Sequence, residues 1–353
     1  MSGPLPAPKT DPTPIFELYR GSYATELLTA AVKEFNVFGR LAKRAMTFDE
    51  LRQAMGLAER PAVVLLTALR AMGLIVVDGT GRLELSPVAR EHLVPGAEFD
   101  VGGYVGLAAE SPGVREMIAR LRTNRPAGQE SDEQGTAFIY RAGVESAMER
   151  AASARHLTLA LAGRARNVAS VLAERVSLAD ARCLLDVGGG TGIYSIAWLR
   201  RHPQLRAIVW DRPEVLKVAQ EMAAAYDVAD RMQCVAGDMF VDPLPAGTDV
   251  CLLSNILHDW DVPECQVLVS RCAEALPEGG RLLIHDVLLN DAHDGPLPIA
   301  LYSAALFTLT EGRAYSAAEF NGWMQAAGLL PQPPAPTLVH CAVLAGIKPS
   351  ASR

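Results

Sequence analysis

Closely spaced glycines follow a short apolar run in this chain, and this combination could hold a nucleotide. The run Cys183–Val187 has the composition of a buried parallel strand, and Gly188, Gly190 and Gly192 come after it. Residues 193–201 then have the composition of a helix. Glycine lets a backbone approach a ligand closely, and the N-terminus of a helix offers unpaired N–H groups. The stretch therefore predicts a nucleotide-binding turn between a strand and a helix.

The spacing of the glycines indicates which nucleotide could bind. A dinucleotide fingerprint places glycine or alanine three positions after its second glycine, where this chain has Ile193. Glycines at every second position, preceded by the acidic Asp186, instead suit a ligand without a pyrophosphate, such as S-adenosylmethionine. The alternative is a glycine-rich turn that binds no ligand.

Polar residues also follow the later apolar runs of this part of the chain. Runs at 207–210, 232–235, 250–253 and 281–284 alternate with helical segments, and this rhythm predicts an α/β fold with a doubly wound, largely parallel sheet. Ligands of such sheets bind beyond the carboxyl ends of the strands. The runs lead to Asp211, to Gly237 with Asp238, to Ser254 with Asn255, and to His285 with Asp286.

Two of these residues suit particular parts of a nucleoside. Asp211 follows Gly188 by 23 positions, which suits a carboxylate that accepts both hydrogen bonds of a ribose diol. Asp238 is followed by Met239 and Phe240, so an acceptor for an adenine amino group lies beside soft or flat apolar groups.

His258 is the candidate general base, since it lies near the predicted cofactor site. The alternative is a structural histidine that caps the helix after the fourth strand.

Composition excludes several other classes of protein. Half of the 353 residues are hydrophobic and the net charge is −7 without a basic run, which disfavours nucleic acid and anionic membranes as partners. No stretch of 18 apolar residues could span a bilayer, and the first residues lack the apolar core of a signal peptide. The six cysteines contain no C-x-x-C pair and suit a reducing cytoplasm.

The first hundred residues predict a winged helix. Residues 15–41 have helical periodicity, Thr47–Glu50 resembles a capping box, and Pro61–Met72 forms a further apolar helix. Residues 74–85 then read as a small hairpin. A winged helix raises the hypothesis of a DNA-binding regulator, but Arg70 is the only basic residue of the helix that would read DNA. This disfavours DNA and suggests that the helix packs in its own core or against a second subunit.

Residues 101–178 are predicted to be mostly helical, with helical segments near 114–121 and 144–176 and a loop at 123–135. Phe138, Tyr140 and Met148 are large side chains near the junction with the glycine turn. They could be ordinary core residues or one wall of a substrate pocket.

Four stretches together resemble the caffeate and acetylserotonin type of S-adenosylmethionine-dependent O-methyltransferase. They are Leu185–Gly192, Asp211–Leu216, Gly237–Phe240 and Leu257–Trp260, the last of which reads Leu-His-Asp-Trp. The resemblance extends from about residue 15 to the end and implies methylation of a phenolic or enolic hydroxyl of an aromatic, polyketide-like molecule. It also implies a homodimer formed through a winged-helix domain. The domains expected are a flexible N-terminus at 1–13, a winged-helix domain at 14–100, a helical linker at 101–178 and a catalytic domain at 179–348.

The resemblance also implies roles for individual residues. Gly188 and Gly190 would line the methionine part of the cofactor, and Asp186 and Ser254 would also belong to the cofactor site. His258 would be the base. The ribose and adenine would be held by Asp211 with Arg212 and by Asp238, Met239 and Phe240, and the substrate would lie between the domains against Asn255, Phe138, Met148, Tyr302, Leu306 and Phe307.

The chain departs from the plant pattern of this family at three positions. Ser254 replaces a lysine that commonly contacts the cofactor, Asp286 replaces a glutamate that orients the base, and Ala314 replaces a second glutamate. Asp286 or Asp259 would then orient His258. These departures leave open a relative that binds the cofactor but hydroxylates, decarboxylates or catalyses a pericyclic step. No metal site is predicted, because the His and Asp residues of 285–294 read as a strand end and a solvated loop.

Overall fold

The computed structural model describes residues 3–125 and 151–350, and these form two compact units. The first unit contains the described residues of Met1–Phe16, Phe138–Leu288 and Tyr315–Arg353. The second contains those of Glu17–Ala137 and Leu289–Ala314. The chain therefore passes through the second unit twice, a discontinuity that the rhythm of the sequence does not indicate. The contiguous boundaries expected from the sequence remain predictions.

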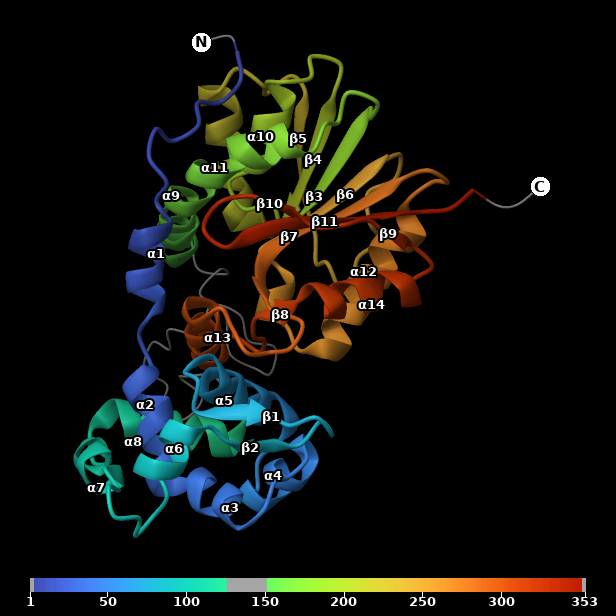
Figure 1. Ribbon diagram of the computed structural model, residues 1–353. Helices are drawn as coiled ribbons and strands as arrows, with labels where there is room; N and C mark the ends of the chain where they lie inside the picture. Colours follow the sequence, from blue (N-terminus) through green and yellow to red (C-terminus); the bar gives the residue numbers. More distant parts are fainter. Residues whose placement is uncertain (1–2, 126–150, 351–353) are drawn as a thin grey trace. The chain divides into compact units, whose positions relative to one another are not determined.

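A mixed sheet forms the centre of the first unit (Figure 1). The strands along it lie in the order β10-β11-β7-β6-β3-β4-β5, and β3 to β7 pair in parallel as the sequence predicts. The apolar run at the end of the chain forms β11, which pairs with β7 in the antiparallel direction. The strand bounds are β3 Cys183–Val187, β4 Arg206–Asp211, β5 Met232–Ala236, β6 Val250–Ser254, β7 Arg281–Leu289, β8 Tyr315–Ser316, β9 Leu330–Pro331, β10 Ala335–Pro336 and β11 Cys341–Ile347.

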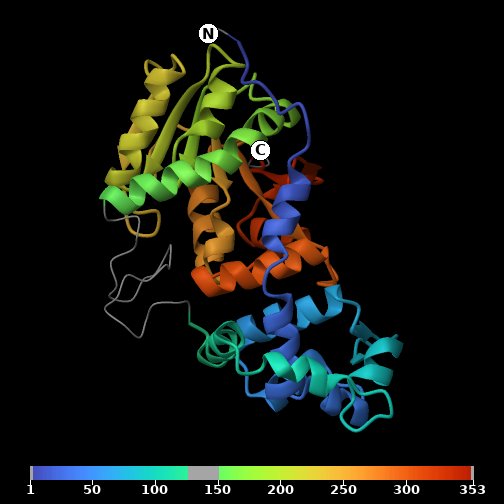
Figure 2. The same ribbon diagram turned by 90° about the vertical axis from the view of Figure 1, so that its left-hand side faces the viewer.

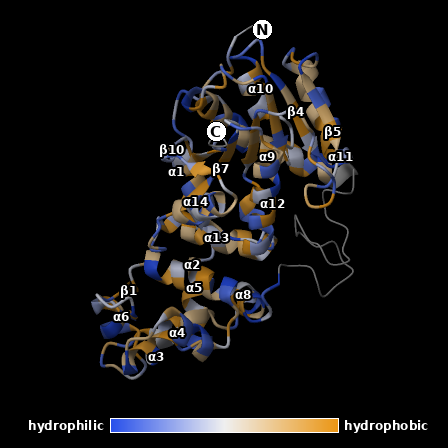
Figure 3. Ribbon diagram, turned by 90° about the vertical axis from the view of Figure 1, so that its right-hand side faces the viewer, coloured by the Kyte–Doolittle hydropathy of each residue, from blue (hydrophilic) through white to orange (hydrophobic). Residues whose placement is uncertain are grey.

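Helices cover both faces of this sheet, as a doubly wound fold requires (Figures 1 and 2). Successive side chains of a strand point to opposite faces, and Leu184 and Leu185 accordingly belong to different core clusters. Hydrophobic residues run along the strands (Figure 3) because both faces are buried. The helices of one face are α9 Ala151–Arg175, α10 Ile193–Leu199 and α11 Pro213–Ala225, and those of the other are α12 Val262–Ala275 and α14 Ala317–Ala326.

The second unit contains the winged-helix elements that the sequence predicts. The strands β1 Ile75–Val77 and β2 Leu83–Leu85 form an antiparallel hairpin. Thr47 and Glu50 make the two reciprocal hydrogen bonds of a capping box at the start of the fourth helix. The helical elements of this part are α2 Ala24–Thr29, the π-helix Ala30–Glu34, α3 Val37–Lys43, α4 Phe48–Met55, α5 Glu59–Ala71, α6 Pro87–His92, α7 Gly102–Val105, the 3₁₀ turn Gly106–Ala108 and α8 Pro112–Thr123.

Residues 15–41 are mostly helical, as the sequence predicts, but they do not form one helix. The segment is divided into α1 Thr13–Arg20, α2, a π-helical turn and α3. Tyr23 and Asn36 both adopt left-handed backbone conformations, with φ of 75° and 45°, and each precedes the start of a new helix. Left-handed residues cannot continue a right-handed helix, so the apolar periodicity continues across breaks that it does not reveal.

Helix α13 Leu297–Leu309 completes the core of the second unit. Leu301, Ala304 and Phe307 belong to the same buried cluster as Leu65 and Leu69 of α5. Residues 126–150, which contain the predicted loop and the first part of the predicted helix 144–176, lie outside the described residues. Within the described ranges, no helix is both long and apolar enough to cross a membrane.

Candidate active site

The glycine turn after β3 has a backbone that requires glycine. Gly188, Gly190 and Gly192 have φ of 65°, 58° and 69°. A Cβ atom at Gly188 would lie 2.5 Å from Cδ1 of Ile256, so a side chain there would collide with the loop after β6. A Cβ at Gly190 would meet nothing within 4 Å. The turn therefore presents its backbone to open space at Gly190 and packs against its neighbours at Gly188.

Two carboxylates support this turn, the buried Asp186 and the partly buried Asp211. Asp186 accepts a hydrogen bond from Ser195 at 2.7 Å through Oδ2, while its buried Oδ1 has no partner among the described residues. Burial raises the pKa of Asp186 to about 7, and Asp211 adds to this effect. Asp211 accepts backbone N–H bonds from Gly190 at 2.9 Å and from Arg212 at 2.7 Å. Burial also raises the pKa of Asp211, against the effect of these two bonds.

Next to β5 lie the residues expected to hold an adenine. Oδ1 of Asp238 accepts a hydrogen bond from the backbone of Phe240, and its Oδ2 lies 3.7 Å from Nη2 of Arg212. Met239 lies close to the glycine turn, since its Cε would be 3.6 Å from a Cβ at Gly188. Phe240 packs edge to face on Trp260 with ring centroids 4.6 Å apart. The structure therefore places apolar and acceptor groups at the ends of neighbouring strands, as the sequence predicts.

These residues fit the cofactor that the sequence predicts. The unpartnered Oδ1 of Asp186 is an acceptor that a buried ammonium group of an amino acid would satisfy. Asp211 still has lone pairs for a ribose diol, because each of its oxygens receives one backbone N–H. The open space at Gly190 admits a ligand close to the backbone.

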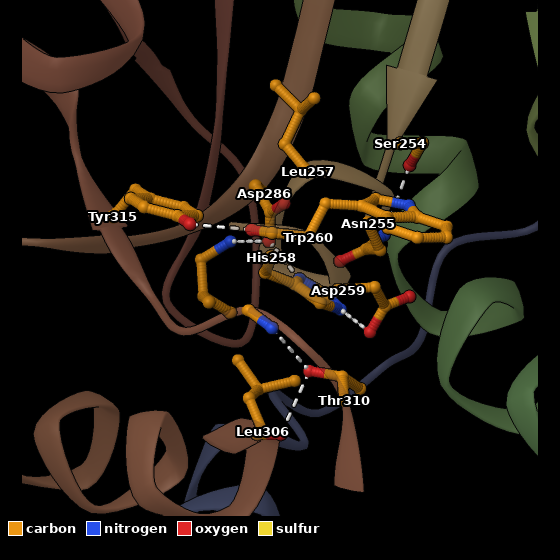
Figure 4. A network of polar contacts seen from close by, with 12 residues as sticks. Ser254, Asn255, Leu257, His258, Asp259, Trp260, Asp286, Leu306, Thr310 and Tyr315 are labelled. Atoms are coloured by element: carbon orange, nitrogen blue, oxygen red, sulfur yellow. Dashed lines mark hydrogen bonds and ion pairs between the residues drawn. The ribbon is translucent and has the colours of Figure 1, made fainter. Parts of the chain in front are cut away.

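His258 lies in the 3₁₀ turn Leu257–Asp259, just after β6, and is 5% exposed. Its Nδ1 lies 2.5 Å from Oδ1 of Asp286 on β7, and its Nε2 lies 3.6 Å from Oδ1 of Asp259 (Figure 4). Parallel pairing of β6 and β7 brings these residues together, because Ser254 is opposite His285 in the register. The loop is also fixed by Tyr315, whose hydroxyl donates to the carbonyl of Trp260 at 2.6 Å.

The carboxylates determine the protonation of His258. Burial acts to lower its pKa, but the charges of Asp286 and Asp259 and the hydrogen bond with Asp286 outweigh burial and raise it above its ordinary value. Oδ1 of Asp286 also accepts the backbone N–H of Val287, so the carboxylate is held in place. Nδ1–H of neutral His258 then donates to Asp286, and Nε2 is left as the proton acceptor.

Asp259 differs from Asp286 in its position. It lies on the Nε2 side of His258, and burial raises its pKa to about 6, although the charge of His258 opposes this effect. Its carboxylate is therefore a second candidate to take up or pass on a proton, whereas Asp286 is the residue that orients the ring.

Not all of the residues predicted to bind substrate lie in the same unit. Asn255 directly follows β6 in the first unit, whereas Tyr302, Leu306 and Phe307 lie on α13 in the second. The guanidinium of Arg20 lies 4.4 Å from the ring centroid of Tyr302. Phe307 is fully buried in the core of the second unit. Phe138 and Met148 lie outside the described residues.

Other positions singled out from the sequence have local partners. Ser254 contacts His285, with Oγ 2.9 Å from Nδ1. Ala314 is fully buried, and its backbone N–H donates to Ser303. Among the residues that the structure describes, no group of three or more His, Cys, Asp or Glu side chains could hold a metal ion.

Sequence reasoning missed a set of residues around Asn255. Tyr194 of α10, Arg164 of α9 and Thr337 before β11 lie near it or near His285. The sequence places His285 and Asp286 after a strand that ends at residue 284, but β7 continues to Leu289, so both residues lie within the strand. No motif marks Tyr194 or Thr337, because the sheet brings them together from segments far apart in the chain.

Known proteins similar to this chain agree with the geometry. Residues 129–330 match the O-methyltransferase domain family. The 3-hydroxy-5-methyl-1-naphthoate 3-O-methyltransferase of Streptomyces sahachiroi is 37% identical over 90% of this chain and 89% of its own length. An O-methyltransferase family 2 protein from Planctomyces limnophilus, solved in complex with apigenin, is 47% identical, with a TM-score of 0.88 over 99% of this chain and 100% of that chain.

The fold is also shared with a more distant enzyme that was solved with its cofactor. Human N-acetylserotonin methyltransferase in complex with S-adenosylmethionine has a TM-score of 0.60 and is 20% identical, over 95% of this chain and 97% of that one. The chain belongs to the O-methyltransferase family, and it is an S-adenosylmethionine-dependent O-methyltransferase.

Proposed function

We propose that the enzyme methylates a phenolic or enolic hydroxyl of an aromatic, polyketide-like small molecule, with His258 as the general base. The observation that carries this proposal is the buried contact between Nδ1 of His258 and Asp286, beside the glycine turn. The naphthoate enzyme and the apigenin complex support an aromatic acceptor.

The cofactor would be held by the residues around the glycine turn. Gly188 and Gly190 would accommodate its methionine part, Asp211 the ribose, and Asp238 with Met239 the adenine. When bound, S-adenosylmethionine supplies an electrophilic methyl group on a sulfonium. Alignment of the acceptor oxygen with that methyl group would account for roughly 7–11 kcal/mol of the barrier.

His258 would remove the proton of the acceptor hydroxyl. A phenol has a pKa of about 10 and histidine one of about 6.5, so proton transfer to an ordinary histidine is unfavourable before the reaction starts. The carboxylates of Asp286 and Asp259 raise the pKa of His258 and reduce this difference. Asp286 would also hold Nδ1–H, so that Nε2 faces the acceptor. General-base catalysis of this kind contributes about 10²–10⁴-fold.

The test begins with binding. Calorimetric titration with S-adenosylmethionine and S-adenosylhomocysteine should give micromolar affinities, with NADH as a control that does not bind. Incubation with S-adenosylmethionine and a panel of naphthols and flavones should then yield products with one added methyl group. Cofactor binding with no methylated product, but with loss of a carboxyl group or gain of oxygen, would replace methyl transfer by the alternative chemistry.

We also propose that the enzyme is a cytoplasmic homodimer formed through its N-terminal unit. In the second unit Leu18, Tyr19, Tyr104 and Leu107 are each 79–84% exposed, so large apolar side chains are available for a second subunit to cover. The six cysteines are free, as in a reducing compartment. Light scattering during gel filtration should give twice the mass of one chain, and Leu18→Asp with Leu107→Asp should give the mass of one chain.

A further inference from the structure

Asn255 has a buried acceptor oxygen that the rest of the site does not use. It is the first residue after β6 and has a left-handed backbone with φ of 57°, which asparagine tolerates better than most residues. Its Nδ2 lies 3.3 Å from the hydroxyl of Tyr194 and 3.1 Å from Oγ of Ser254 (Figure 4 shows the contact with Ser254). Its Oδ1 is buried and has no partner among the described residues.

A chain of hydrogen bonds fixes which way this amide faces. The donor and acceptor roles along the chain follow from its far end, at Thr337. The hydroxyl of Thr337 donates to the backbone carbonyl of Cys341 at 3.0 Å, because a carbonyl can only accept. Thr337 Oγ1 must therefore accept from Nε2–H of His285, at 3.1 Å. Burial lowers the pKa of His285 to about 3, so the ring is neutral and its Nδ1 carries no proton.

The same logic continues to Asn255. Nδ1 of His285 accepts the hydroxyl proton of Ser254 at 2.9 Å, which leaves Oγ of Ser254 as an acceptor toward Asn255. Only the NH₂ group of the amide can donate to it, since a carbonyl oxygen there would face a lone pair. Oδ1 of Asn255 is thus turned away from the chain of bonds and can bind only a hydrogen-bond donor.

The groups nearby narrow the kind of donor. The positive charge of Arg164 acts on Tyr194, His285, His258 and Asp259, and the negative charge of Asp286 acts on His285, His258 and Asp259, so charges of both signs lie within the same region. A carboxylate has no proton to donate and would meet the lone pairs of Oδ1. A neutral hydroxyl can donate to Oδ1 whatever the balance of these charges.

Asn255 directly precedes the residues that contact the cofactor turn and that carry the candidate base. The next residue, Ile256, packs against Gly188 of the cofactor turn, and His258 follows two positions later. We propose that Oδ1 of Asn255 binds a second hydroxyl of the aromatic acceptor, beside the hydroxyl that is methylated, and that Ser254, His285 and Thr337 are positioning residues for it. This inference rests on the proposed function and names its substrate class, the vicinal or peri dihydroxyarenes.

Three naphthalenes of equal ring size test the inference. They are 2,3-dihydroxynaphthalene, 2-naphthol without the second hydroxyl, and 3-hydroxy-2-naphthoate with a carboxylate in its place. The affinity of each is measured by calorimetry in the presence of S-adenosylhomocysteine, and kcat/KM with S-adenosylmethionine. The diol should exceed the other two by tenfold or more in both quantities, because a buried acceptor left unpaired penalises the analogue.

Asn255→Ala should reduce this preference toward unity. Equal affinities of the wild-type enzyme for the three compounds would overturn the inference. So would an Asn255→Ala enzyme that keeps the preference but binds S-adenosylhomocysteine more weakly, because the amide would then serve the cofactor. If S-adenosylhomocysteine binds and no aromatic compound does, the proposed function itself is wrong.

A matched pair of variants at Thr337, the end of the chain of hydrogen bonds, tests whether these residues position Asn255. Thr337→Val removes the group that accepts from His285, whereas Thr337→Ser retains it. The preference for the diol should fall severalfold in Thr337→Val and return in Thr337→Ser, with the affinity for S-adenosylhomocysteine unchanged in both. An equal preference in the two variants would show that the chain of bonds does not orient Asn255.

Discussion

Two histidines of the same site are both buried, but they differ in their hydrogen-bond partners and in the direction in which their pKa values are shifted. His258 and His285 are 5% and 0% exposed; His285 lies on β7, and His258 lies in the turn after the neighbouring strand β6. His258 contacts the carboxylates of Asp286 and Asp259, and its pKa is raised. His285 contacts the hydroxyls of Ser254 and Thr337, and burial lowers its pKa to about 3.

The comparison teaches that the partner of a buried histidine decides what it can do. Desolvation disfavours the imidazolium in both cases, but only a nearby negative charge can reverse the effect. A hydroxyl can accept or donate, so it fixes the tautomer without supplying charge. One histidine can therefore exchange a proton during catalysis, whereas the other can only transmit an orientation.

The largest effect is expected when the titratable histidine is removed. His258→Ala should lower kcat by about 10²–10⁴-fold, because the Nε2 atom that would accept the proton of the hydroxyl is lost. Calorimetry should show an affinity for S-adenosylmethionine close to that of the wild type. Wild-type turnover by this variant would contradict the assignment of the base.

Replacing the charge beside it should move the pH dependence. Asp286→Asn should lower kcat by about 10–10²-fold and lower the pKa of His258, since the attraction and hydrogen bond of Asp286 act to raise it. The rate requires neutral His258, so in the wild type it should rise with pH through a pKa above the ordinary 6.5. In the variant this rise should occur at lower pH, as the profile of kcat/KM between pH 5 and 9 would show. If kcat/KM of the variant rose at the same pH as in the wild type, the rise would belong to the titration of a group other than His258.

Asp186 extends the comparison to a buried acid that has no cationic partner among the described residues. Its folded pKa of about 7 lies above its unfolded value near 3.8, so its contribution to stability is full at low pH and is lost as the pH rises toward 7. Asp186→Asn removes this loss of stability at rising pH, because an asparagine side chain does not ionise. The melting temperature of the cofactor-free variant should therefore rise relative to the wild type by several degrees between pH 5 and 8. A constant difference across this range would show that the carboxylate is already ionised.

The smallest effect on proton transfer is expected at the second histidine. In His285→Gln, kcat/KM should rise at the same pH as in the wild type, because His285 is neutral throughout this range. The same pH profile as for Asp286→Asn provides the measurement. If the rise of kcat/KM occurred at a different pH in His285→Gln, the two histidines would titrate together.

The parts of the site that depend on local sequence could be predicted from it. The glycine turn, the acidic residues at the ends of β4 and β5, and the Leu-His-Asp-Trp stretch each combine residue type with a position at the end of a strand. The capping box at Thr47 is equally local. In each case a few neighbouring residues fix both the backbone and the chemistry.

The parts of the site that depend on contacts across the sheet could not be predicted from the sequence. Thr337 meets His285 only because β11 returns antiparallel to β7, and sequence periodicity does not specify that pairing. The inclusion of residues 289–314 in the second unit is of the same kind. The breaks at Tyr23 and Asn36 were missed for a different reason, since their left-handed conformations leave the apolar pattern unchanged.

The discontinuity of the second unit has a consequence for synthesis on the ribosome. About 240 residues separate the end of α5 from the end of α13, which supplies Leu301, Ala304 and Phe307 to the core shared with α5. At 5–20 residues per second, this interval takes roughly 12–48 s. The apolar face of α5 would wait that long for its partner, exposed to water or held by a chaperone. The second unit would thus complete its folding late in translation, although most of its residues are made early.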